Sequence, residues 1–128
     1  MNKSIPTVFT PRLAPEIFRK RLLMEGFFTR DDVTEATIKE YFRVITSELS
    51  LRTYAEPIVH STGGQGKAVN QGFDAFVPLI DSGIYMSLWA GPRFVSIIVY
   101  TCAEFDEAKA LSRTREFFGI GDTDAMLF

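Results

Sequence analysis

Residues 73–102 decide the fold, and they read FDAFVPLI, then DSG, then IYMSLWA, then GP, then RFVSIIVYTC. The three long runs are rich in Val, Ile, Phe, Tyr and Trp and are bounded by Asp, Ser, Gly and Pro, which is typical of antiparallel strands joined by turns. Asp tolerates unusual backbone angles and Gly accepts a positive φ, so Asp81-Ser82-Gly83 is predicted to form a tight turn. The run FVSIIVY is apolar at nearly every position, which indicates a sheet that is buried on both faces.

Two strands and two helices are predicted outside this stretch. The strands cover residues 19–29 and 52–62, and the helices cover residues 31–49 and 105–118. Asp32 with Glu35 resembles a capping box at the start of the first helix, whose apolar side chains recur at helical spacing. Asp106 can cap the second helix, and Gly119 can end it.

The remaining segments have no clear periodicity. Residues 1–17 contain three prolines and are expected to form an irregular arm that lies on the domain or on a neighbouring subunit. The glycine-rich residues 63–67, GGQGK, lack the spacing and the Ser or Thr of a phosphate-binding loop, so a mobile loop beside a pocket is expected. The tail, residues 119–128, is expected either to dock on the core or to fray.

These elements predict one α+β domain that spans residues 1–128. It is a two-layer sandwich in which an antiparallel sheet carries helices on one face. Two helices are too few to cover so many apolar strand residues, and the chain has 12 Phe. The uncovered face therefore predicts a homodimer.

Composition excludes several classes of function. Hydrophobic residues make up 46% of the chain and the net charge is -2, so no electrostatic footprint for nucleic acid or for an anionic membrane is expected. No apolar run approaches the roughly 20 residues that span a bilayer, and the N-terminal residues lack the apolar core of a signal peptide, which favours a cytoplasmic protein. Cys102 is the single cysteine and His60 the single histidine, so neither an intramolecular disulfide nor a dedicated metal site is expected.

The order of motifs in residues 73–102 resembles the small bacterial S-adenosylmethionine decarboxylases. The shared pattern is a strand that ends in an acidic residue (Asp81), then Ser82, then a strand with Trp89, then a strand that ends in Thr101-Cys102. The glycine-containing entry to the first of these strands is matched by residues 70–72, Asn-Gln-Gly. The resemblance implies an S-adenosylmethionine decarboxylase-like fold in which another subunit covers the open sheet face.

The resemblance also implies a chemistry. In that family the acidic-Ser bond cleaves itself and the serine becomes a covalent pyruvoyl cofactor, so Asp81 and Ser82 would be the cleavage site. The pyruvoyl carbonyl forms a Schiff base with a small-molecule substrate that carries an amino acid moiety, and it accepts electrons as carbon dioxide leaves. Cys102 would then donate a proton to the substrate carbon, in a reaction that feeds polyamine synthesis.

Three residues depart from the family pattern. Gly83 and Ser87 stand where the family has histidines, the second of which serves self-processing. Gly91, after Trp89, stands where the family has a carboxylate that holds the ribose of the substrate. A serine hydroxyl is scarcely basic at neutral pH, so self-cleavage is expected to be slow or absent, and the substrate is S-adenosylmethionine or a smaller amino acid.

Each candidate residue also has a structural alternative. Ser82 can belong to an ordinary hairpin turn, and Cys102 can be a buried small hydrophobe. Asp74 can be an edge-strand charge that faces water, or it can bind a substrate amine near the turn. Trp89 is the other candidate for substrate binding. Two functions therefore stay open: a pyruvoyl-dependent decarboxylase, or a relative without self-processing that serves as a binding or regulatory subunit.

Overall fold

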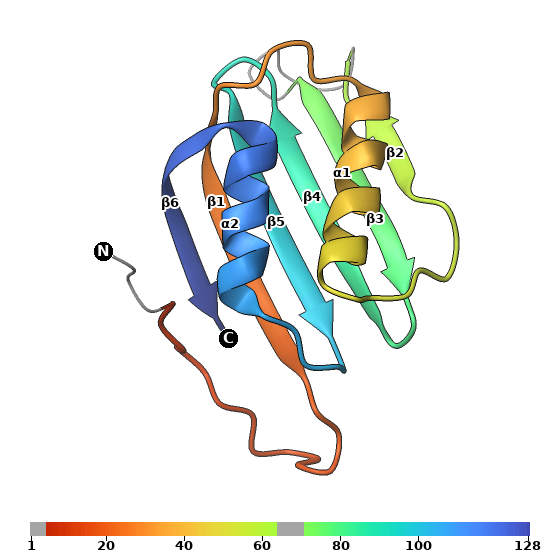
Figure 1. The fold of residues 1–128 in the computed structure, drawn as a ribbon, viewed down its shortest axis with the longest axis vertical. Helices are drawn as coiled ribbons and strands as arrows, with labels where there is room; N and C mark the ends of the chain where they lie inside the picture. The colour runs from red at the N-terminus through yellow and green to blue at the C-terminus, as the bar shows by residue number, and fades with distance from the viewer. Residues whose placement is uncertain (1–4, 64–70) are drawn as a thin grey trace.

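A computed structural model describes residues 5–63 and 71–128 of the chain. Within them, six strands form one antiparallel sheet, and two helices lie side by side on one of its faces (Figure 1). The strands are β1 (Lys20–Phe28), β2 (Ile58–Ser61), β3 (Gly72–Leu79), β4 (Ser82–Trp89), β5 (Phe94–Thr101) and β6 (Ile120–Leu127), in the spatial order β2-β3-β4-β5-β1-β6, and the helices are α1 (Glu35–Glu48) and α2 (Glu107–Phe118). The predicted α+β two-layer sandwich is confirmed.

The ends of the predicted elements differ from those observed in three places. Thr34, not Asp32, caps α1, because Thr34 and Thr37 exchange the two hydrogen bonds of a capping box while Asp32 takes a positive φ of 55° outside the helix. The second strand is reduced to Ile58–Ser61, with one further bridge from Thr53 to Leu79. The tail was expected either to dock on the core or to fray. Instead it forms the strand β6, which pairs with β1.

The core lies between the helices and the inner face of the sheet. Alternate residues of each strand point inward, so that Met24, Met86 and Ile97 are almost fully buried. The two helices are joined by a hydrogen bond of 2.8 Å between the buried hydroxyls of Tyr41 and Thr114. Burial raises the pKa of the Tyr41 phenol far above its usual value, so this hydroxyl stays protonated.

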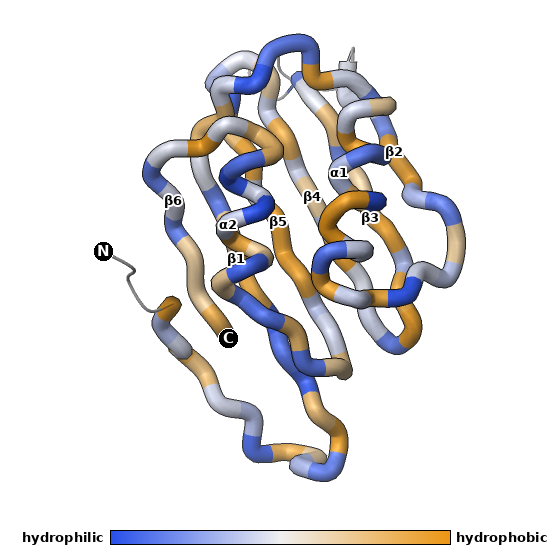
Figure 2. The backbone as a smooth tube through the Cα atoms, viewed as in Figure 1, coloured by the Kyte–Doolittle hydropathy of each residue, from blue (hydrophilic) through white to orange (hydrophobic). Residues whose placement is uncertain are grey.

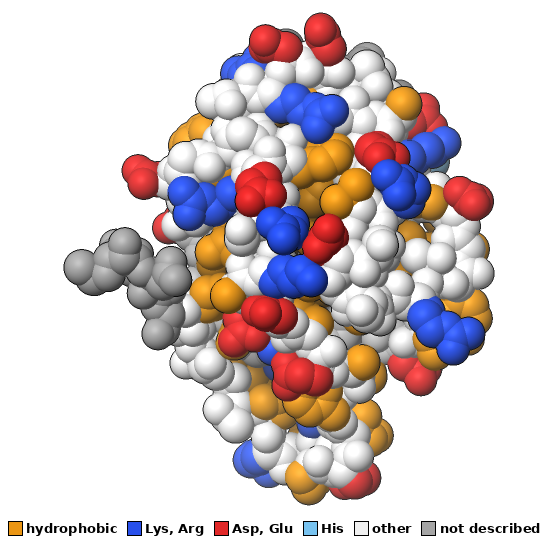
Figure 3. All heavy atoms as spheres, viewed as in Figure 1, with side chains coloured by type: hydrophobic (Ala, Val, Ile, Leu, Met, Phe, Trp, Pro, Cys, Tyr) orange, Lys and Arg blue, Asp and Glu red, His pale blue; other side chains and the backbone are white. Residues whose placement is uncertain are grey.

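The outer surface of the helices is charged. Figure 3 shows Lys, Arg, Asp and Glu side chains gathered over this side of the molecule. Glu48 of α1 forms ion pairs with Lys109 and Arg113 of α2. The helix layer therefore faces solvent, and neither helix of the described residues is long and apolar enough to cross a membrane.

The opposite side of the sheet, which we call the open face, has no helix over it (Figure 1). One row of side chains across its six strands is polar: His60, Asp74, Ser87, Ser96, Glu25 and Asp124. The next row is apolar: Ile58, Phe76, Tyr85, Ile98, Leu23 and Met126. Figure 2 shows how hydrophobic β5 is along its length, yet Tyr100 at its end is 36% exposed. Within one chain, the sheet is thus buried on one face only.

The close approach of β3 and β4 requires a glycine at position 72. A Cβ atom there would lie 1.8 Å from the backbone oxygen of Leu88, which cannot move without breaking the strand pairing. We expect Gly72→Ala to lower the free energy of unfolding by about 1–3 kcal/mol. Gly91→Ala is the matched control, because a Cβ at Gly91 meets nothing within 4 Å. Urea unfolding measures both, and equal stabilities for the two variants would contradict the register.

Candidate functional site

The turn between β3 and β4 is displaced from its predicted position. Leu79 pairs with Ser82, so that Ile80 and Asp81 form the turn and Ser82 is already the first residue of β4. Asp81 itself takes the positive φ, at 54°. Gly83 lies in the strand instead, where a Cβ would come within 2.6 Å of the Phe76 ring. The glycine is needed for the close packing of that ring, not for the turn.

Ser82 lies beside Cys102 at the end of the sheet. The backbone N–H of Cys102 donates a hydrogen bond of 3.0 Å to the Ser82 hydroxyl oxygen. Cys102 directly follows β5, and its thiol is free and half-buried. Three of the predicted site residues, Asp81, Ser82 and Cys102, therefore meet in space although 20 residues separate Ser82 from Cys102.

A cavity of about 360 Å³ lies beside this junction. Its lining is Phe76, Asp81, Ser82, Gly83, Tyr85, Ile98 and Tyr100. The walls are thus three aromatic rings and one Ile, with the Asp81 carboxylate as the charged group. The aromatic residues were not predicted as site residues, although their alternation along the strands was a signal that they share one face of the sheet.

The other predicted residues form a second cluster on the open face. The Ser87 hydroxyl donates to Asp74 Oδ1 at 2.9 Å, and the Tyr85 and Ser87 hydroxyls are 2.7 Å apart. His60 stands opposite Asp74 on β2. Because Tyr85 also lines the cavity, this chain of hydrogen bonds runs from Asp74 to the cavity wall.

The structure does not bring Ser87 or Trp89 to Ser82 of the same chain. Ser87 is five residues further along β4, which is about 16 Å for an extended strand, and it points to the opposite face. Trp89 is further still and packs on Phe94, with ring centroids 5.6 Å apart. Any contact of these two side chains with Ser82 would have to come from another copy of the chain.

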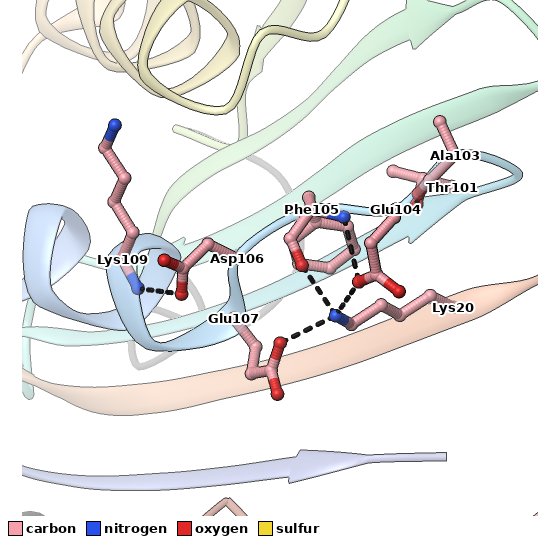
Figure 4. A network of polar contacts seen from close by, with 8 residues as sticks. All are labelled: Lys20, Thr101, Ala103, Glu104, Phe105, Asp106, Glu107 and Lys109. Carbon is pink, nitrogen blue, oxygen red and sulfur yellow. Dashed lines mark hydrogen bonds and ion pairs between the residues drawn. The ribbon is translucent and has the colours of Figure 1, made fainter.

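The segment after Cys102 is anchored to β1 by Lys20 (Figure 4). The Lys20 ammonium donates to the Phe105 carbonyl and to Glu107, each at 2.6 Å, and also to Glu104. Burial opposes the charge of Lys20, but the hydrogen bonds and negative charges of Glu104 and Glu107 outweigh it, so the Lys20 pKa is raised. The hydrogen bond from Lys20 holds the Glu107 pKa below its usual value. This ionic contact fixes the backbone that presents Cys102 to Ser82.

In the part of the chain that it describes, the structure gives no support to a metal site or to a site at the glycine-rich segment. Within residues 5–63 and 71–128, no group of three or more His, Cys, Asp and Glu side chains is arranged to hold a metal ion. Of the glycine-rich GGQGK segment only Gly63 is described, and the expected loop beside a pocket lies outside the described residues. Asn70 of the glycine-containing strand entry also lies outside them.

Removing the Lys20 anchor tests its effect on the Cys102 segment. We expect Lys20→Met to lower the free energy of unfolding by about 1–2 kcal/mol at pH 7 and to speed amide hydrogen exchange in residues 102–107. The pKa of Glu107 is depressed in the folded state, so its contribution is present above about pH 4.5 and is lost as the pH falls through the folded value. The difference between wild type and variant should therefore shrink at pH 3.

The control for this prediction is Lys39→Met, which removes an exposed ion pair with Glu35 on α1. Its effect should stay below about 0.5 kcal/mol. Unchanged exchange of residues 102–107 in Lys20→Met would contradict the anchoring role.

Comparison with known proteins supports the fold. No family model matches the chain, and a search of curated proteins found no match. Among solved structures, the crystal structure of the adenosylmethionine decarboxylase from Aquifex aeolicus VF5 matches with a TM-score of 0.71. The match covers 88% of this chain and 89% of that one, at 15% sequence identity. The chain therefore has the fold of adenosylmethionine decarboxylase.

Proposed function

We propose that the chain is a pyruvoyl-dependent decarboxylase of an amino acid substrate, and that it forms its reactive group by slow self-cleavage between Asp81 and Ser82. The observation that carries the proposal is the junction of three features at one end of the sheet. Ser82 directly follows a left-handed Asp81, its hydroxyl is held by the Cys102 N–H, and a cavity of about 360 Å³ opens beside both. The shared fold with an adenosylmethionine decarboxylase supports the same chemistry.

The proposed self-cleavage uses the atoms of the two residues and one water. The Ser82 hydroxyl attacks the carbonyl carbon of Asp81, the peptide C–N bond breaks, and an ester joins the residues. A base then removes the Ser82 α-hydrogen, and the Cβ–Oγ bond breaks as its electron pair leaves with the Asp81 carboxylate. Water finally displaces the nitrogen as ammonia and leaves a ketone at position 82.

The surroundings of Ser82 favour the first of these steps. The Cys102 N–H occupies one acceptor site of the hydroxyl oxygen and fixes it at the head of β4. The left-handed backbone of Asp81 costs roughly 1–2 kcal/mol for a residue with a side chain, and cleavage of the following bond releases that cost. A strained turn beside a positioned hydroxyl is thus suited to an attack on the preceding carbonyl.

The chain's own residues would then handle the substrate. A pyruvoyl group at position 82 supplies an electron sink for the departing carbon dioxide. The rings of Phe76, Tyr85 and Tyr100 would enclose the substrate and exclude water. The Cys102 thiol would donate a proton, since the backbone of Cys102 is hydrogen-bonded to Ser82. The cavity lies near the lower end of the usual range for ligand sites, about 300–1,000 Å³, which favours a small amino acid over S-adenosylmethionine.

The proposed active species is a homodimer in which the open face is covered by a second copy. Phe76, Tyr85 and Tyr100 stay 36–43% exposed in one chain, and Ile58 stays 52% exposed. Two such faces are the same surface, so they can pair around a twofold axis with like rows in contact. If the two open faces cover each other, both sides of β5 are buried, as its apolar sequence indicates. The cavity would then also be closed.

A second candidate function is a binding or regulatory subunit that never cleaves. One observation favours it. Among the described residues, the hydrogen-bond partner of the Ser82 hydroxyl is the backbone N–H of Cys102, and no basic side chain is hydrogen-bonded to this hydroxyl. Ser87, which stands where the resembled family has a histidine, is about 16 Å away along β4. Without a base the α-hydrogen of Ser82 is not removed.

Intact-mass spectrometry of the purified protein over several days separates the two functions. The decarboxylase predicts a slow conversion into one fragment that ends at Asp81 and one that begins at position 82, with one water gained and one ammonia lost in total. Ser82→Ala should remain full length, and Ser96→Ala, which removes a serine hydroxyl from the neighbouring strand β5 away from the cleavage site, should cleave like the wild type. A wild type that stays full length throughout would overturn the proposal and leave the binding subunit.

A further inference from the structure

The segment before β1 carries an unusual number of exposed apolar side chains. We call residues 8–19 the arm. Its exposed members are Val8 (61%), Phe9 (56%), Leu13 (66%), Ile17 (52%) and Phe18 (46%). Five large apolar side chains are thus exposed on twelve residues, a density that is typical of interaction sites.

The arm starts on the body of the domain and then leaves it. The N–H of Val8 donates to the Leu127 carbonyl at 2.9 Å, and the Leu127 N–H donates to the Pro6 carbonyl at 2.8 Å, so the chain first follows the edge of β6. It then runs beyond the end of the sheet before it returns as β1 (Figure 1). The same end carries the turn at Asp81 and the start of β4. The arm and the cavity therefore share one end of the molecule.

Contacts within the arm restrict its shape. Pro11 and Pro15 restrict its backbone, and the Ile17 N–H donates to the Ala14 carbonyl at 3.0 Å. The guanidinium of Arg19 reaches back to the Leu13 carbonyl. A segment that is already ordered loses little conformational entropy when it docks, so its apolar area is available for binding.

The base of the arm is continuous with the open face. The Phe9 ring lies 5.6 Å from the Arg21 guanidinium, and Arg21 stands opposite Tyr100 in the pairing of β1 with β5. Tyr100 lines the cavity beside Ser82. Phe9, Arg21 and Tyr100 thus lead from the arm to the cavity wall, and the more distant residues of the arm lie beyond them.

Charge favours a second copy of this chain as the occupant of that surface. The arm carries Arg12 and Arg19 against Glu16. The open face and the cavity carry four carboxylates, Glu25, Asp74, Asp81 and Asp124, against Arg21. One chain therefore offers an apolar, net positive arm and an apolar, net negative face, which complement each other between two copies.

We infer that the arm of one copy lies on the open face of a second copy, over the aromatic rim of its cavity. A twofold axis parallel to the strands keeps the two cavity ends together. The arm leaves the sheet on its β1–β6 side, and the cavity lies towards its β3–β4 side. The same axis places the first side of one copy over the second side of the other. The arm would then supply the missing wall of the cavity and exclude water from the junction at Ser82.

This inference rests on the proposed homodimer but not on self-cleavage, so it is tested in a Ser82→Ala background. Sedimentation velocity measures the dimer dissociation constant of four proteins: this parent, an arm variant, a rim variant and a control. We expect an arm variant, Leu13→Ser with Ile17→Ser, and a rim variant, Phe76→Ser with Tyr100→Ser, each to weaken the dimer by at least about tenfold. Tyr54→Ser is the control, since Tyr54 is 69% exposed but belongs to neither surface.

Mixing the two weakened variants identifies where the arm binds. In a mixture, the intact arm of the rim variant can dock on the intact rim of the arm variant, so the mixed dimer should be tighter than either parent dimer. Thermal unfolding of each variant checks that it is folded. A wild-type-like dimer for the arm variant, no rescue on mixing, or a monomeric parent protein at every concentration would each overturn the inference. None of these results depends on whether the Asp81–Ser82 bond cleaves.

Discussion

The sheet has two apolar faces and only two helices to cover them, and the rest of the structure depends on that mismatch. Residues such as Met86 and Ile97 alternate with Tyr85 and Ile98 along neighbouring strands, so the same segments supply a buried core and an exposed aromatic surface. The helices cover the first set and turn their charges to solvent. The second set leaves a surface on which a polar row from His60 to Asp124 lies beside an apolar one. That polar row would fix the relative position of two stacked sheets, since a slipped pairing would bury its carboxylates against apolar side chains.

The pairing of the strands also determines where the candidate site lies. Ser82 and Asp81 stand where β3 turns into β4, and the antiparallel pairing of β4 with β5 brings Cys102 to the same end. The cavity lies on the open face at this end, so a reaction at Ser82 would take place where the chain leaves its own sheet uncovered. Lys20 completes the arrangement, because its partly buried ammonium holds the segment after Cys102 against β1.

The sequence was sufficient for the strands and helices whose periodicity is strong, and for the sheet order implied by consecutive hairpins. It placed the α1 cap at Asp32 because it could not show that Thr34 is extended and that its hydroxyl reaches the Thr37 N–H. It missed β6, since the polar residues of GIGDTDAMLF hide the pairing with β1 that gives this strand its stability. Residue type alone also assigned Gly83 to the turn, whereas the approach of the Phe76 ring decides its role.

For the candidate site, the resemblance to a known family singled out Asp81, Ser82 and Cys102, and the structure brings these three residues together at one end of the sheet. The sequence could not separate them from Ser87, Asp74 and Trp89, because distance along a strand and the side to which a residue points require the register. The aromatic lining of the cavity could not be predicted from the sequence either. Phe76, Tyr85 and Tyr100 come from three strands and become neighbours only in the folded sheet.

The central claim is that position 82 becomes an electrophilic carbonyl at the mouth of the cavity. The most direct measurement is reductive trapping: aged protein is incubated with a small amino acid and sodium cyanoborohydride, which couples an amine covalently to a ketone, and the fragment masses are recorded. The account predicts that the fragment beginning at position 82 gains the mass of the reduced amine adduct, while Ser82→Ala gains nothing. A fragment or a full-length chain that takes up no amine under these conditions would contradict it.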